Sequence, residues 1–495
     1  MDFPRVRRVW RRVFALAWPV MAEQTFRTAM RTTDVIITAL ISPAAVVAIG
    51  LADLYARFPL RIGLGLGGGS IALSSQDTGA GATENRDEAV TQAILIGALA
   101  GLPFVAFGLL FGEAAIDVFG TIVGRETPPE VVRLGSTYLA VVFATAPARH
   151  VALVGARALQ GTGDTRTPMY VNVAANSVNI VGSAVLGLGL FGAPDLGVFG
   201  VGLATAGANV LTAGLLIAAI AGTWTPANFA RPRDPTLARQ LIRVSAPRTI
   251  EGFGSEIAEF PFNALLLGFG EAVNAGFQLG RRVYQQVTGP FSRGYNVAAS
   301  VLVGQALGEG DPEGARFNGW AVAGLGVATV GVIGVGLALA AEPVVTHPTV
   351  VELFGGDDPA TLEYAVAFAR VYGLSAAALV CFSALSGSLQ GASETRIPLL
   401  ARVTGMFGFF LGLSWLLGET LGFGPPGTYV GVLLAYVWMA AVVALGFAYT
   451  GWAPRAADMM AERGTEAGAG TDEAGAGTAH AETGDENPGS DDADV

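Results

Sequence analysis

The sequence contains no lysine, one cysteine and three histidines. A phosphate-binding P-loop requires a lysine, so the chain has no such loop and ATP-driven transport by it is disfavoured. The single cysteine, Cys381, excludes an intrachain disulfide. His150, His347 and His480 are too scattered for a metal-ligand cluster. Because no nucleophile–histidine–acid arrangement is visible either, we expect neither an enzyme nor a protein with a cofactor.

Charged residues are also scarce. They make up 14% of the chain, against 52% hydrophobic residues and a mean hydropathy of +0.51, a composition that does not suit a soluble surface. Apolar runs of about 20 residues, enough to cross a bilayer, follow one another with short polar turns between them. We therefore expect an all-α membrane protein with about twelve transmembrane helices, with the lipid bilayer as a partner and no nucleic acid.

The arginines predict the orientation of the chain. Several precede the first apolar run, which is too long for a signal peptide and lacks a cleavage site, so it should be retained. Arginines also recur in every second turn, and positive residues favour the cytoplasmic side. We expect a multi-pass protein of the cell membrane with both termini in the cytoplasm. The N-terminal arginines are Arg5, Arg7, Arg8, Arg11 and Arg12.

The expected spans form two groups of six, separated by a proline- and arginine-containing linker. We predict an N-terminal lobe over 1–222, a cytoplasmic linker over 223–240, a C-terminal lobe over 241–452 and an acidic, disordered cytoplasmic tail over 453–495. The predicted spans are 14–42, 46–77, 89–112, 132–159, 168–191, 196–222, 241–269, 273–307, 317–341, 362–389, 398–417 and 428–451.

The two groups resemble each other in sequence. The segment LQGTGDTRTP begins at residue 159 and LQGASETRIP begins at residue 389, 230 positions later. Gln76 and Gly79 likewise match Gln305 and Gly308, at an offset of 229. The sequence thus predicts two six-helix bundles related by internal duplication, about an axis along the membrane normal. Repeated bundles of this kind are typical of secondary transporters.

Three segments carry a resemblance to a known family. They are the turn GTGDTRTP at 161–168, the asparagine-rich YVNVAANSVN at 170–179 and GVGLAT at 200–205. Together they resemble the multidrug and toxic-compound extrusion (MATE) family. The resemblance implies an antiporter that exports small organic compounds, cationic or amphipathic, by alternating access and is driven by Na⁺ or H⁺. We expect a monomer.

Ionisable side chains inside spans are functional candidates because burying a charge in a membrane is expensive. Asp34 matches an aspartate that binds the coupling cation or proton in archaeal members of the family. Asn172, Asn176, Asn179 and Ser183 recur at spacings of four, three and four, which places them on one helical face.

Oxygen ligands suit a hard cation, so we predict a cation or proton coupling site from Asp34, Asn179, Ser183 and Thr205, with Na⁺ possible at Asp34, Asn179 and Thr205. The alternative is that the amides and hydroxyls only hydrogen-bond between helices. Ser183 replaces a second carboxylate of the relatives, so the resemblance leaves the ion and its stoichiometry open.

The duplication provides an internal control for this site. The counterparts of the asparagine and serine positions in the second copy are Arg402, Met406, Phe409 and Leu413. The fold therefore does not require the polar face, and we expect ion coupling in the N-terminal half.

A substrate cavity is predicted less specifically from intramembrane polar residues. Glu23 and Arg27 are spaced for an ion pair, and Glu256 lies near a glutamate found in some MATE branches. Glutamate–arginine pairing between helices is an equal alternative for the C-terminal residues. The candidates are Glu23, Arg27, Asn172, Asn176, Glu256, Glu259 and Tyr284.

Two rival functions stay open. A lipid-linked oligosaccharide flippase would share the doubled bundle and have a cationic cavity, which Arg27, Arg31, Arg57, Arg157, Arg281 and Arg282 allow. A non-transporting receptor would need room for a ligand domain, which the short loops do not provide. Two Gly-x-Gly-x-x-Gly strings, at 63–68 and 187–192, do not lie between a strand and a helix, and we interpret them as helix-packing positions.

Overall fold

The computed structural model describes residues 3–124, 126–354 and 358–463. The first half contains seven α-helices and a short 3₁₀ turn: α1 Phe3–Ile41, α2 Pro43–Gly79, α3 Thr83–Val123, α4 Pro129–Ala144, α5 Ala146–Gly161, α6 Arg166–Leu188, η1 Leu190–Gly192 and α7 Gly197–Ala221.

The second half follows a connection over residues 222–234. Its elements are α8 Pro235–Phe269, α9 Glu271–Gly308, α10 Pro312–Leu339, α11 Ala341–Val345, α12 Pro348–Phe354, α13 Pro359–Gly391, α14 Arg396–Val403, the π-helical η2 Thr404–Leu413 and η3 Leu416–Thr420, and α15 Pro425–Tyr449. A last helix covers residues 452–463, and we call it the C-terminal helix.

The described helices account for the expected spans. Eight are long and apolar enough to cross a membrane, or nine if α4 and α5, bent by 51° against each other, form one span. The long helices α1, α8 and α9 carry the intramembrane charges, which lower their mean hydropathy. With these three the count reaches the twelve expected, and the all-α membrane fold is confirmed.

Several long helices begin at a polar residue followed by proline. The side chains of Ser42, Asp234, Asp311 and Asp358 each accept a hydrogen bond from a backbone N–H in the first turn that follows. Proline fits the first helical position because its missing N–H would have no partner there. These helix starts are therefore specified locally by the sequence.

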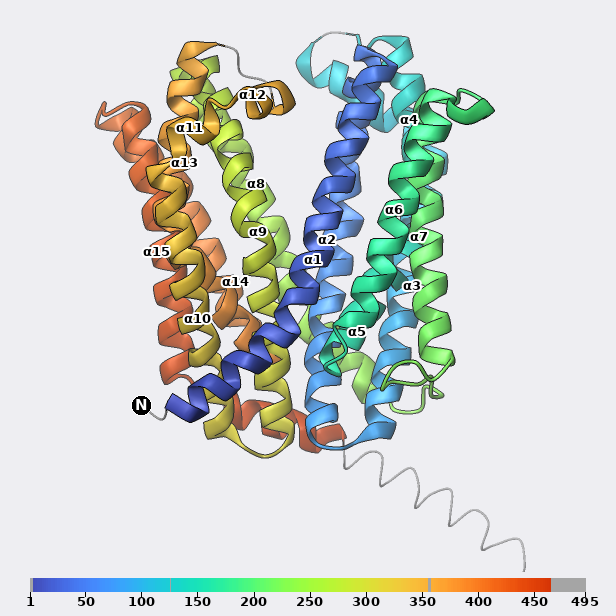
Figure 1. Ribbon diagram of the computed structural model, residues 1–495, viewed down its shortest axis with the longest axis vertical. Helices are drawn as coiled ribbons and strands as arrows, with labels where there is room; N and C mark the ends of the chain where they lie inside the picture. Colours follow the sequence, from blue (N-terminus) through green and yellow to red (C-terminus); the bar gives the residue numbers. More distant parts are fainter. Residues whose placement is uncertain (1–2, 125, 355–357, 464–495) are drawn as a thin grey trace, which may run out of the picture.

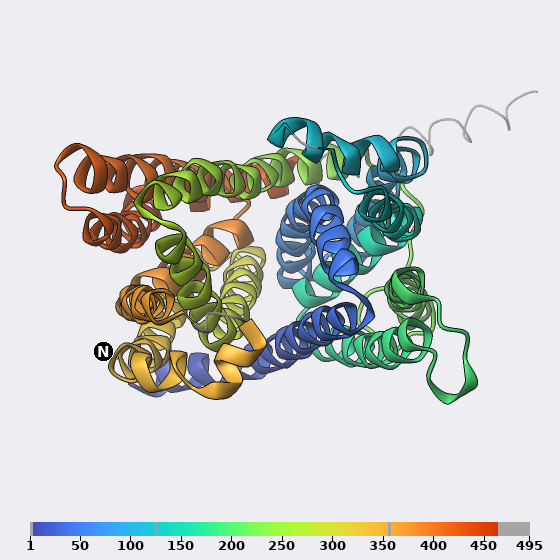
Figure 2. The ribbon, with the colours of Figure 1, turned by 90° about the horizontal axis from the view of Figure 1, so that it is seen from above.

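The helices form two lobes that stand side by side (Figure 1). The described start of α1, the turn between α2 and α3 and the C-terminal helix lie at the same end of the molecule, the lower end in Figure 1, which we call the terminal side. Seen from above, the lobes occupy opposite halves of the molecule, and α1 runs along one edge of both (Figure 2).

The first helix, α1, packs against both lobes. Its N-terminal part packs into the core of the second lobe through Val9, Val13 and Ala17. Its C-terminal part contributes Ile37 to the core of the first lobe. The start of α1 therefore packs with the other half, while the division of the chain at residue 222 stays a prediction.

The lobes meet at the terminal side through matching residues of α2 and α9, a contact region that we call the seam. A Cβ atom on Gly79 would collide with the backbone oxygen of Gln305, and one on Gly308 would collide with that of Gln76. The contact is reciprocal and uses equivalent residues of the duplication. The seam therefore lies on the pseudo-twofold axis between the repeats.

The twin turns have the same backbone design and flank the seam. Gly163 and Ser393 both adopt positive φ, 95° and 59°. Asp164 Oδ1 accepts a hydrogen bond from the N–H of Arg166 at 3.1 Å, and Glu394 Oε1 accepts one from that of Arg396 at 3.2 Å. Each side chain thus caps the following helix.

Glycines of α2 admit close packing across the seam. A Cβ on Gly65 would collide with Thr249 Oγ1, and one on Gly69 with Ser245 Oγ, both on α8 of the other lobe. This agrees with the packing interpretation of the Gly-x-Gly-x-x-Gly string at 63–68.

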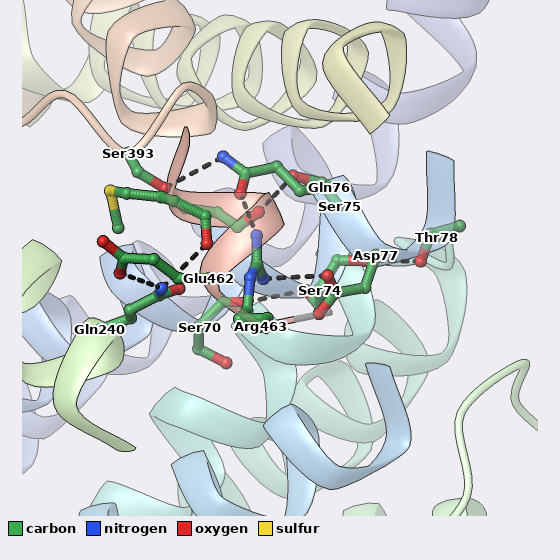
Figure 3. Close-up of polar contacts among 12 residues, drawn as sticks. Ser70, Ser74, Ser75, Gln76, Asp77, Thr78, Gln240, Ser393, Glu462 and Arg463 are labelled. Atoms are coloured by element: carbon green, nitrogen blue, oxygen red, sulfur yellow. Dashed lines mark hydrogen bonds and ion pairs between the residues drawn. The ribbon is translucent and has the colours of Figure 1, made fainter. Parts of the chain in front are cut away.

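The C-terminal helix closes the seam from the terminal side (Figure 3). Arg463 is 1% exposed, and its guanidinium lies 2.9 Å from Asp77 Oδ1 and donates to Gln76 Oε1 at 2.7 Å. Gln240 Nε2 of α8 donates to the backbone oxygen of Met459 at 2.9 Å. The helix therefore bridges α2 of the first lobe and α8 of the second.

This helix corrects one sequence prediction. Residues 453–463 were expected to begin a disordered tail, but they are helical, and Trp452 and Arg463 are fully buried. The remainder of the predicted tail, 464–495, lies outside the described residues.

Candidate functional site

The structure brings the four predicted coupling residues together in the first lobe. Asn179 Nδ2 on α6 donates to Thr205 Oγ1 on α7 at 3.3 Å, and Ser183 Oγ donates to Asn179 Oδ1 at 3.2 Å. The Asp34 carboxylate on α1 lies beside Ser183. The group therefore joins α1, α6 and α7.

One Asp34 oxygen, Oδ1, is buried and has no hydrogen-bond partner among the described residues. An unpaired buried carboxylate oxygen is costly, so a proton or a cation is the natural occupant of this position. The side chains around it offer carboxylate, amide and hydroxyl oxygens as possible cation ligands. Na⁺ and similar hard cations prefer ligands of these types.

Sequence reasoning missed two neighbours of this group. Tyr138 on α4 is 8% exposed and lies beside Thr205. Asp53 on α2 interacts electrostatically with both Asp34 and Tyr138. The rule that marks intramembrane charges as functional applies equally to Asp53 in the span predicted at 46–77 and would have found it.

Asp53 changes the expected charge of the site. Its side chain is exposed and interacts electrostatically with Arg31 and Arg149. The sequence predicted a single carboxylate because Ser183 stands at the position of the second. The structure places a second carboxylate near Asp34 from a different helix.

Two further residues of the polar face do not join this group. Asn172 Nδ2 donates to the backbone oxygen of Pro168 at 2.9 Å, within its own helix. Asn176 Nδ2 is buried without a partner among the described residues. The polar face of α6 therefore has two parts. Asn179 and Ser183 are hydrogen-bonded to each other and belong to the group around Asp34, whereas Asn172 and Asn176 lie nearer the terminal side and do not.

The predicted cavity residues are mostly held in ion pairs. Glu23 Oε1 lies 3.1 Å from Arg27, as the spacing predicts, and Glu259 Oε2 lies 2.7 Å from Arg281. Tyr284 stacks on Tyr372 with ring centroids 5.2 Å apart. For Glu259, the structure favours the alternative of glutamate–arginine pairing between α8 and α9.

Glu256 has a role that the sequence did not indicate. It accepts from Arg57 at 2.9 Å and also pairs with Arg61, and both arginines belong to α2 of the other lobe. Beside it, Phe58 and Phe253 pack with ring centroids 5.6 Å apart. These contacts join the lobes farther from the terminal side than the glutamines of the seam do.

Comparison with protein families finds one match. The family model described as MatE matches residues 19–185 and again 255–416. Two matches in succession agree with the internal duplication.

Curated relatives are similar over most of the chain. A probable multidrug resistance protein NorM from Bradyrhizobium diazoefficiens is 30% identical over 445 residues, which cover 87% of this chain and 91% of the relative. A protein of the same description from Rhodopseudomonas palustris is 29% identical over 448 residues, which cover 87% of this chain and 90% of the relative.

A solved structure shares the fold. It is described as the outward-facing conformation of a multidrug resistance MATE family transporter, and it superposes with a TM-score of 0.78 at 18% identity, over 90% of this chain and 96% of that one.

Proposed function

We propose, because the chain belongs to the multidrug and toxic-compound extrusion (MATE) family, that it exports small organic compounds in exchange for Na⁺ or H⁺. The family is one of transporters rather than of enzymes or receptors. The relatives are described as multidrug resistance proteins, and this supports drug-like substrates. The alternative, a lipid-linked oligosaccharide flippase, would need a cationic substrate path.

The arrangement of the lobes supports alternating access. The seam and the C-terminal helix close the terminal side, whereas the other ends of the lobes stand apart in Figure 1. We propose that the terminal side faces the cytoplasm, as the N-terminal arginines indicate. Transport then requires the seam to part.

The observation that carries ion coupling is the unpartnered Asp34 oxygen among Ser183, Asn179 and Thr205. Loading of Na⁺ or H⁺ at Asp34 neutralises the carboxylate. That change alters the balance of charges on α1, which contacts both lobes. Such a helix is well placed to link ion binding to lobe movement.

The test is Asp34→Asn in proteoliposomes that carry a fluorescent substrate and an imposed Na⁺ or H⁺ gradient. We expect gradient-driven transport to be lost, while the protein keeps its size-exclusion profile and thermal stability. Asp195→Asn is the matched control, because Asp195 Oδ1 only accepts a hydrogen bond from Gly197 N in an exposed loop and the amide preserves that acceptor. Full transport by Asp34→Asn would sink the proposal.

A further inference from the structure

An unusual concentration of positive charge lies where the two lobes face each other. Six arginines of four helices take part, and we call them the arginine cluster. Arg27 interacts electrostatically with members on α1, α5 and α9, and Arg248 of α8 does so with members on α5 and α9. The members are Arg27, Arg31, Arg149, Arg157, Arg248 and Arg293.

Half of these arginines have no counter-charge in contact. Arg31, Arg149 and Arg293 form no hydrogen bond and no ion pair within 4.0 Å with any residue that the structure describes. Arg157 donates only to the neutral amide of Gln160, at 3.2 Å. Each of these side chains is at least partly solvent-accessible.

The carboxylates nearby do not neutralise the cluster. Glu23 is paired with Arg27. Glu251 lies 2.7 Å from Arg248 and 3.4 Å from Arg402, so two arginines already share it. Asp53 interacts electrostatically with Arg31 and Arg149 but lies in ion-pair contact with neither. Positive charge therefore remains in excess.

The backbone of α2 is shaped to admit these side chains from both lobes. A Cβ on Gly67 would lie 2.7 Å from Arg157 Cγ, and one on Gly68 would lie 3.2 Å from Arg248 Cγ. Larger residues would push the arginines away. The second half of the glycine string thus serves the cluster as well as helix packing.

An aromatic pair follows Arg57, which interacts electrostatically with Arg31 of the cluster. Phe58 is 52% exposed and packs on Phe253 across the lobes. Beside this pair, Arg57 and Arg61 share the single carboxylate of Glu256. The negative group of an amphipathic molecule could contact the arginines here, while its apolar part contacted Phe58 and Phe253.

We propose that the arginine cluster binds the anionic group, a carboxylate or phosphate, of an amphipathic substrate. Guanidinium groups are well suited to carboxylate and phosphate, and uncompensated charges within a membrane protein mark substrate or ion paths. The inference rests on the proposed export function and replaces the cationic substrate expected from the sequence. A lipid phosphate and a soluble organic anion present the same chemistry.

The test compares two dyes of one ring system. Carboxyfluorescein is anionic and rhodamine 6G is cationic, and binding of each to the full-length protein in detergent is followed by fluorescence anisotropy. We expect carboxyfluorescein to bind at least about tenfold more tightly, and its binding to weaken as salt screens the charges. Tighter binding of rhodamine 6G would overturn the proposal.

Variants locate the binding. Arg293→Gln and Arg149→Gln should each weaken carboxyfluorescein binding by about tenfold, the loss expected for one charge-assisted contact. Arg370→Gln is the matched control, since among the described residues Arg370 forms only an exposed ion pair, with Glu342 at 3.5 Å. If Arg293→Gln does not fold, Arg293→Lys keeps the charge and should retain most of the affinity. Unchanged affinity in both glutamine variants would contradict the proposal.

Competition separates the sources of the anion. Displacement of carboxyfluorescein by dodecyl phosphate but not by inorganic phosphate would identify a lipid-like substrate, and displacement by neither would identify a soluble carboxylate. Displacement by inorganic phosphate at equal concentration would show a site for simple ions and overturn the amphipathic substrate. Binding of carboxyfluorescein needs no ion gradient. The binding measurement therefore still tests the arginine cluster if Asp34 proves not to couple ions to transport.

Discussion

At the scale of single residues, the seam depends on two glycines that face backbone rather than side chain. Gly79 and Gly308 each lie against a carbonyl of the opposite repeat. Backbone cannot rotate away as a side chain does, so an added methyl group must separate α2 from α9. These two positions therefore set how closely the lobes approach.

We predict that Gly308→Ala lowers stability by about 1–3 kcal/mol, the usual cost of overpacking. Thermal unfolding of the purified protein in detergent measures it. Gly207→Ala on α7 is the control, because a Cβ there meets nothing within 4 Å, and alanine in a helix should be neutral or slightly stabilising. Equal melting temperatures for the two variants would mean that the lobes do not meet as described.

A second residue-scale prediction concerns Asp53, the carboxylate that interacts electrostatically with Asp34. If both bind cations, Asp53→Asn should lower the number of coupling ions moved per substrate while leaving some transport. The measurement is the substrate gradient reached at equilibrium against imposed Na⁺ or H⁺ gradients of different size. A slope identical to that of the wild type would assign Asp53 a structural role only.

At the scale of elements, the C-terminal helix holds the terminal side closed. Its Arg463 supplies the counter-charge of the buried Asp77, and Gln240 holds its backbone. Removing one partner of a buried pair leaves the other charge uncompensated, which costs about 3–5 kcal/mol. Parting of the seam must break the same pair.

We predict that Arg463→Gln destabilises the protein strongly and that adding Asp77→Asn recovers part of the loss, because the double variant buries no charge. A double-mutant cycle of thermal unfolding quantifies the coupling. Additive losses would show that the pair contributes nothing to closure.

The solvent accessibility of a residue at the seam gives a second test of whether the C-terminal helix closes the terminal side. In a Cys381→Ser background, Ser75→Cys places a thiol at a seam position that is 0% exposed. We expect slow labelling by a membrane-impermeant maleimide in this protein and faster labelling when Arg463→Gln is added. Equal labelling rates would show that the helix does not guard the seam.

Elements that depend on a pattern within a short segment of sequence could be predicted, whereas those that depend on long-range contacts could not. The spans follow from their apolar length, and the twin turns follow from a repeated glycine, acid and proline pattern, so both were predicted close to their observed places. The C-terminal helix was missed because its burial depends on long-range contacts. They include the ion pair of Arg463 with Asp77 and the packing of Trp452 and Ala456 in the core of the second lobe. The crossing of α1 between lobes is likewise a tertiary property that composition does not encode.

The candidate site likewise has a part that the local sequence predicted and a part that depends on packing. The helical spacing of Asn179 and Ser183 predicted a shared face, and the structure places them together. Asp53 is an intramembrane charge and could have been marked as a candidate from the sequence. Its approach to Asp34, like that of Tyr138, depends on the packing of α2 and α4, which no local pattern reveals. The counterpart of α6 in the second repeat also differs in form, since it is π-helical over Thr404–Leu413, so the repeats diverge where the polar face lies.

At the scale of the whole molecule, the proposed transport cycle requires the two lobes to move against each other as the seam parts. The Phe58–Phe253 and Arg57–Glu256 contacts join the lobes on the side of the seam away from the termini. These contacts and the seam must change during the cycle, while the core of each lobe stays intact.

We predict that locking this contact stops transport. Phe58→Cys with Phe253→Cys, in the Cys381→Ser background, is treated with a short bifunctional thiol reagent whose link is reducible. Transport should fall to background and return on reduction, and neither single cysteine variant should respond. Undiminished transport by the cross-linked protein would show that the lobes need not move relative to each other here.

The reciprocal contact of Gln76 and Gly79 with Gln305 and Gly308 has the form of an isologous dimer interface. Two separate half-length chains with this surface would associate only as far as their concentration allowed. The connection over residues 222–234 makes the same association intramolecular, so its strength depends on a fixed effective concentration and not on expression level. A contact weak enough to part in every transport cycle can therefore still re-form each time.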